Sequence, residues 1–185
     1  MPLGSARFGL LGAAELGKLK LIQAQTFSSV SSAAFESIEE STYDVHFMTF
    51  FFDRASASGT GWFGIQFREN GTYETANVYD SASIWESVTD GGNYSNTNGD
   101  NIARLGIGTS YTIKVAGYIY FYNLGDSSIY SGLTFHHMLP NTGGTNFGSN
   151  GGSLLPQASK VDGIKFTFDV GDNISGYANL YGLSA

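Results

Sequence analysis

Side chains that could bind a cation are concentrated in the segment DGGNYSNTNGDN, residues 90–101. Five of its residues offer a side-chain oxygen at spaced positions: Asp90, Asn93, Asn96, Asn98 and Asp100. Such oxygens are the ligands that Ca²⁺ prefers, but the spacing departs from the EF-hand loop, because Asp100 directly follows Gly99 and no glutamate occupies the closing position. We therefore expect a polar surface loop here and no bound metal.

The other residues that could perform catalysis are poorly placed for it. His136 and His137 are adjacent on a predicted strand, so their side chains point to opposite faces and cannot easily share one metal. Glu36, Glu39 and Glu40 form an acidic cluster, but nothing places two of them across a cleft as a glycosidase requires. The nucleophile-elbow, P-loop and dinucleotide-binding motifs do not occur. We expect no enzymatic activity and no cofactor.

Tyrosines alternate along the segment GYIYFYN, where they are Tyr118, Tyr120 and Tyr122. Ile119 and Phe121 lie between them, so a strand here has two apolar faces. Tyrosine is enriched at interfaces and presents an apolar ring with a polar tip. The pattern predicts a subunit interface or a platform for sugar rings, unless the fold itself covers this strand on both faces.

Composition restricts the class of protein. The 185 residues are 42% hydrophobic and 15% aromatic, which suits one domain with a substantial core. A net charge of −7 leaves no basic surface for phosphate contacts, and no stretch approaches the ~18 apolar residues of a membrane span. We expect neither nucleic acid nor a membrane as a partner. The chain has no cysteine, so a disulfide framework and a thiolate metal site are both excluded.

Period-two alternation and frequent glycine turns predict an all-β fold of roughly eight to ten strands and no helix. The last prediction is a β-hairpin, with strands over 164–170 and 177–183 joined by a turn at 171–173. The whole pattern favours an antiparallel jelly-roll-like β-sandwich over residues 18–185, preceded by a short N-terminal arm, residues 1–17.

The arm is rich in glycine but contains Phe8, Leu10 and Leu11. These apolar side chains favour an arm that anchors the domain in an assembly by covering a partner. The alternative is an additional strand or cap on its own domain.

A second glycine-rich segment, PNTGGTNFGSNGGSLLPQAS, covers residues 140–159 and contains Phe147, Leu154 and Leu155. We interpret it as irregular, and it is too long to be a plain connection in a compact domain. It is therefore expected to be a loop that docks on a neighbouring subunit, or else a variable surface loop.

The end of the chain has a characteristic pattern. Residues 161–183, VDGIKFTFDVGDNISGYANLYGL, place an alternating apolar strand before a turn, and the segments ISG and LYGL follow. This pattern resembles the closing hairpin of a jelly-roll domain found in tailed-bacteriophage virion proteins. The middle of the chain is similar to that family through the segments AAFESI, YDVHFMTFFFDRASASG and IQFRENGTYETANVY. The likeness extends over residues 25–185.

The resemblance implies a non-enzymatic virion structural protein, made in the host cytoplasm, that acts in capsid decoration or in a tail fibre or appendage. Its expected partners are further copies of itself, as a homotrimer, and capsid or tail proteins. The resemblance supplies no binding residues. Two alternatives remain: a receptor-binding module at a tail tip that binds a host surface glycan, and a cellular carbohydrate-binding domain, which would carry a secretion signal.

Overall fold

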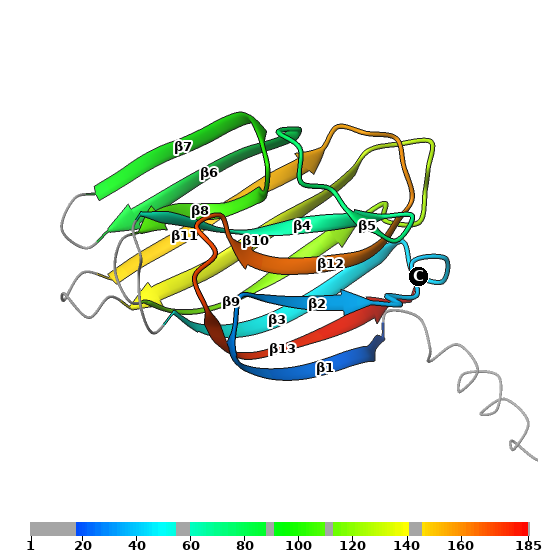
Figure 1. Cartoon of the computed structure of the whole chain (residues 1–185), viewed down its shortest axis with the longest axis horizontal. Helices are drawn as coiled ribbons and strands as arrows, with labels where there is room; N and C mark the ends of the chain where they lie inside the picture. The colour runs from blue at the N-terminus through cyan, green and yellow to red at the C-terminus, as the bar shows by residue number, and fades with distance from the viewer. Residues whose placement is uncertain (1–17, 55–59, 88–90, 110–112, 141–145, 185) are drawn as a thin grey trace, which may run out of the picture.

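The computed structural model describes residues 18–54, 60–87, 91–109, 113–140 and 146–184, so the predicted arm lies outside the described residues. These residues form thirteen β-strands and no helix, which confirms the predicted all-β class with more strands than expected. Accordingly, the described residues contain no helix that could span a membrane. The strands build two antiparallel sheets packed face to face, a jelly-roll-like β-sandwich (Figure 1).

The larger sheet has eight strands, in the spatial order β1 (Leu19–Val30), β13 (Ile174–Leu183), β3 (Val45–Arg54), β9 (Ile113–Tyr122), β10 (Ser131–Pro140), β11 (Asn146–Leu155), β6 (Tyr79–Ser87) and β7 (Gly91–Asp100). Figure 1 shows this sheet extending from β1 at the bottom to β7 at the top. The smaller sheet has five strands: β2 (Ser32–Glu36), β12 (Val161–Phe168), β4 (Gly61–Glu69), β5 (Thr72–Tyr73) and β8 (Ala103–Thr109).

Phenylalanine rings hold the two sheets together. Phe52 on β3 lies 4.6 Å from Phe166 on β12 and 5.0 Å from Phe63 on β4, measured between ring centroids. Phe50 packs beside them, 5.6 Å from Phe166. All four rings are at most 3% exposed, and burial of each one stabilises the fold by about 2 kcal/mol. The alternating apolar positions of the sequence thus form the interior, as predicted.

The predicted terminal hairpin is wrong in its pairing, although both of its strands exist. β12 pairs with β2 and β4 in the smaller sheet, whereas β13 pairs with β1 and β3 in the larger one. The turn between them therefore crosses from one sheet to the other. A buried ion pair fastens this crossing, because Arg54 at the end of β3 donates to Asp172 and lies 4.6 Å from the ring of Phe168.

The glycine-rich segment predicted to be irregular contains a central strand, β11, which pairs with β10 on one side and β6 on the other. Its inward serines replace apolar packing with hydrogen bonds to neighbouring carbonyl groups: Ser149 donates to Ile84 and Ser153 donates to Arg104. Gly151 has no room for a side chain, since a Cβ there would lie 2.4 Å from the carbonyl oxygen of Ala82. The absence of a side chain at Gly151 therefore allows β11 and β6 to lie close together.

The polar segment predicted to be a surface loop is also a strand, β7, which forms one edge of the larger sheet by pairing with β6. Its outward side chains are exposed and those on its other face are small or polar, so the strand has no apolar alternation in the sequence. Asp90 lies outside the described residues.

His137 on β10 is buried with an exposure of 2%. Its Nε2–H donates to the carbonyl oxygen of Leu105 at 2.5 Å, and its Nδ1 has no hydrogen-bond partner within the described residues. Burial lowers the pKa of His137 to about 4. The side chain is therefore neutral at pH 7, as a core residue.

We expect acid to destabilise the protein through this histidine. The unfolded chain binds a proton near the usual His pKa of about 6.5, while the folded protein resists it until the pKa of His137, about 4, is reached. The contribution of His137 to the free energy of unfolding is fully present above about pH 6.5. It falls by about 3 kcal/mol as the pH drops to about 4. Urea midpoints measured across this range test it.

The control for this measurement is the neighbouring residue. His136→Gln changes an exposed side chain and should keep the wild-type dependence on pH, whereas His137→Gln should reduce it to the part contributed by His46, whose pKa is also lowered by burial. Equal slopes for the wild type and His137→Gln would contradict the assignment.

Candidate functional site

The outward residues of the larger sheet are aligned in cross-strand rows. One row crosses all eight strands: Leu21, Tyr181, Phe47, Tyr120, Thr134, Gly152, Ala82 and Asn96. The row is aromatic over β13, β3 and β9, and becomes small or polar from β10 onward. The outer face therefore has two zones, an aromatic patch and a groove.

The aromatic patch consists of six side chains: Phe47, Phe51, Tyr118, Tyr120, Tyr177 and Tyr181. Phe47 lies at its centre, with ring centroids 4.8 Å from Tyr120, 6.0 Å from Tyr118 and 6.1 Å from Tyr181. Tyr118 and Tyr177 keep 41% and 50% of their surface exposed, so no described residue covers the patch. An apolar surface of this kind on a sheet face is typical of a binding or assembly site.

The groove is made of three connected hollows over β10, β11, β6 and β7. The first, of about 620 Å³, lies between the rings of Tyr122 and Tyr130 on one side and Asp80 and Asn98 on the other. The second, of about 290 Å³, shares Ala82 with the first and reaches Tyr94.

The third hollow, of about 180 Å³, extends the groove to Glu86, His136 and Gly148. It shares Ile84 and Asn150 with the second, so the three hollows adjoin one another in a row. The groove is shallow and follows the direction of β11.

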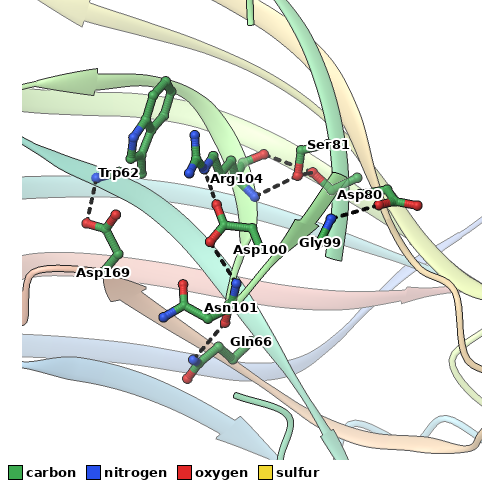
Figure 2. A network of polar contacts seen from close by, with 10 residues as sticks. Trp62, Gln66, Asp80, Ser81, Gly99, Asp100, Asn101, Arg104 and Asp169 are labelled. Carbon is green, nitrogen blue, oxygen red and sulfur yellow. Dashed lines mark hydrogen bonds and ion pairs between the residues drawn. The ribbon is translucent and has the colours of Figure 1, made fainter. Parts of the chain in front are cut away.

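A polar network holds the β7 side of the groove against the rest of the sandwich, and Figure 2 shows its members. Arg104 forms an ion pair with Asp100 at the end of β7, and its guanidinium lies 4.2 Å from the ring centroid of Trp62. Its backbone N–H donates to Ser81 on β6 at 3.0 Å. The Asp80 carboxylate on β6 accepts a hydrogen bond from the N–H of Gly99 on β7 at 3.1 Å. This side-chain contact adds to the backbone pairing of the two strands.

The structure brings together some of the residues that the sequence singled out. Tyr118 and Tyr120 lie in the aromatic patch, Tyr122 lines the groove, and Leu154, with 37% of its surface exposed, lines it as well. The interpretation of the tyrosine strand as covered on both faces is therefore wrong, although β9 is a central strand.

Two of the predicted contact residues belong to the protein's own core. Leu155 is fully buried in the sandwich, so it is not available to a partner, and that prediction is wrong. Phe147 packs against the same core, with its ring 5.6 Å from that of Trp85. Both point inward because β11 is a strand and alternates. Phe8, Leu10 and Leu11 lie outside the described residues.

Sequence reasoning missed four of the six patch residues and most of the groove. Phe47 and Phe51 occur in a run that is apolar on both faces, which was the available signal for an exposed aromatic face. Tyr94 lies in the segment 90–101, which the sequence predicts to be a polar loop, so nothing indicated that its ring would lie on a sheet face. The signal for Tyr177 was its spacing from Tyr181, which puts both on one face of β13.

The candidate catalytic groups are engaged elsewhere. Glu36, Glu39 and Glu40 form ion pairs with three different partners, Arg68, Lys20 and Lys160 respectively. His46 is buried and its Nε2–H donates to the carbonyl oxygen of Ile38, and burial lowers its pKa. Among the described residues no cluster of three or more His, Cys, Asp or Glu could hold a metal ion.

Neither a family model nor a curated protein matches this chain. Among solved structures, the chain is similar to a protein of unknown function from Shewanella oneidensis, with 11% sequence identity and a TM-score of 0.28 over 92% of this chain and 77% of that one. A likeness this weak carries no argument about function, so the site is interpreted from its own residues.

The polar network leads to a prediction about stability. Arg104→Met should destabilise the protein by about 2 kcal/mol, because it leaves the largely buried Asp100 carboxylate without its charged donor. Urea unfolding at pH 7 measures the change.

A matched control is the exposed pair of Lys114 and Asp53, 3.8 Å apart. Lys114→Met should change the stability by no more than about 0.5 kcal/mol, since a solvated pair contributes little. If both variants lost the same stability, the network would have no special structural role.

Proposed function

We propose that the protein is a non-enzymatic structural module on the surface of a bacteriophage particle, where it works by protein–protein packing. The aromatic patch is the observation that carries the packing part of the proposal. The virion part is supported by the resemblance of residues 25–185 to jelly-roll domains of phage virion proteins.

Packing explains why so many rings lie on an exposed sheet face. Phe47 already contacts both Tyr120 and Tyr181, so these side chains are held in place before any partner arrives. Little conformational entropy is then lost on association, and the apolar area removed from water supplies the driving force. Tyrosine hydroxyl groups at the margin keep the unassembled protein soluble.

The proposed assembly is a homotrimer, attached to capsid or tail proteins as a decoration or an appendage. A closed ring of identical subunits lets each patch be covered by its neighbour without open-ended growth. The titratable groups described above support a role without catalysis, because their partners are structural.

Oligomeric state tests the packing. The wild-type chain should sediment as a trimer, and the double variant Tyr118→Ser with Tyr177→Ser should sediment as a monomer, because it removes the two exposed rings of the patch. Analytical ultracentrifugation measures both, and circular dichroism should show that the variant is still folded, since neither ring is in the core.

Tyr94→Ser is the matched control, because Tyr94 is 84% exposed on the same face but belongs to the groove. It should leave the trimer intact. A wild-type chain that remains monomeric at high concentration would overturn the packing proposal.

The virion part predicts a fixed copy number in purified particles. Quantitative mass spectrometry against the major capsid protein should find one copy for every one to few capsid subunits if the protein decorates the capsid, and a few per cent if it belongs to the tail. Its absence from particles would refute the virion role.

A further inference from the structure

The groove has the shape of a site for an extended chain. Its three hollows share lining residues and follow β11 from Leu154 to Gly148. At the usual rise of a strand these residues span roughly 20 Å. A compact ligand would fill one hollow, whereas an extended ligand can occupy all three.

Several positions on the floor of the groove have no side chain or only a methyl group. Gly152 and Ala82 are neighbours in the central cross-strand row, and Gly132 lies between Tyr122 and Leu154 in the adjacent row. At Gly148 a Cβ would meet no other atom within 4 Å. The space above these positions is open because they are glycine or alanine, and a larger side chain would fill it.

The rim combines rings with amide and hydroxyl groups. Tyr130 is 50% exposed, and its backbone is held because Asn123 donates to its carbonyl oxygen at 3.3 Å. Tyr94 lies at the middle of the groove, and Asn98 and Asn150 offer amides beside the rings. A tyrosine ring can stack on the apolar face of a sugar while amides bond its hydroxyl groups.

The charges of the groove exclude an anionic ligand. Its two carboxylates, Asp80 and Glu86, lie at opposite ends, and no lysine or arginine lines the three hollows as the structure describes them. A phosphate or a sulfated chain needs cationic partners. The groove therefore suits an uncharged ligand.

A peptide strand is a poorer fit. β10, β11 and β6 are paired on both sides, so they have no backbone donors or acceptors free to extend the sheet, and the groove lies on their face. A second copy of the protein would need a convex apolar element to fill it. From this shape and chemistry we infer that the groove binds a neutral linear oligosaccharide, with Tyr122, Tyr130 and Tyr94 as the ring platforms.

This inference rests on the groove alone and is independent of the packing role of the aromatic patch. The test uses the full chain and a panel of neutral oligosaccharides: cellohexaose, laminarihexaose, maltohexaose, xylohexaose and N-acetylated chitohexaose. At least one should bind at millimolar concentration or below, and should shift the nitrogen-15 amide resonances of β11, β6 and β7.

Gly148→Leu is the decisive variant, because a Cβ at this position would meet no atom within 4 Å and Gly148 lines the third hollow. It should fold with the wild-type thermal midpoint and lose binding. Ala116→Leu is the matched control, since Ala116 is exposed on the same face but lines none of these hollows. It should bind as the wild type does.

Two further measurements sharpen the result. Tyr130→Ser should weaken binding about tenfold, the size expected for one lost stacking contact. The affinity should be the same at low and high salt, because a neutral ligand has no charge to screen.

Three outcomes would overturn the inference. One is that no member of the panel binds; another is that Gly148→Leu binds as tightly as the wild type. The third is that groove resonances shift with protein concentration in the absence of sugar, which would assign the groove to a second copy. The patch variant Tyr118→Ser with Tyr177→Ser should keep its sugar affinity, so failure of one proposal is distinguishable from failure of the other.

Discussion

The cross-strand register of the larger sheet is the constraint on which the rest of the molecule depends. In β3, inward and outward side chains alternate, and a slip of one residue would move Phe50 and Phe52 to solvent and Phe47 and Phe51 into the core. Contacts between Phe52 and Phe166 hold the register from inside. The same register aligns the outward tyrosines of β9 with Phe47.

The two faces of the larger sheet both carry aromatic side chains, but one face is covered by the smaller sheet and the other is exposed. The inner face is closed by the smaller sheet, and β8 extends that cover over β11 and β6. The outer face has no second layer among the described residues: one half carries the clustered rings of the patch, and the other half carries outward glycines with separate tyrosines at the rim. This division separates a surface suited to permanent association from one suited to a ligand that binds and leaves.

Sequence periodicity was sufficient for the fold class, for the phenylalanine-rich strands β3, β4 and β12, and for the three tyrosines of β9. It could not reveal β7 or β11, because their pairing rests on backbone hydrogen bonds, and Asn96 or Gly152 contributes no apolar pattern. It also could not reveal that β12 and β13 belong to different sheets. A turn at Asp172 looks the same in a hairpin and in a crossing between sheets, and Arg54, which distinguishes them, is far away in the chain.

The glycines of β11 have a mechanical consequence. Side-chain pairs across neighbouring strands stiffen a sheet, and the outward positions Gly148 and Gly152 contribute none. Bending compliance is therefore concentrated along β11, between a stiff aromatic half and the β6–β7 ribbon. The bracing by β8 on the inner side confines that compliance to the outer surface. We expect the local twist of the sheet, and with it the width of the depression above β11, to vary more readily than the packing of the phenylalanine interior.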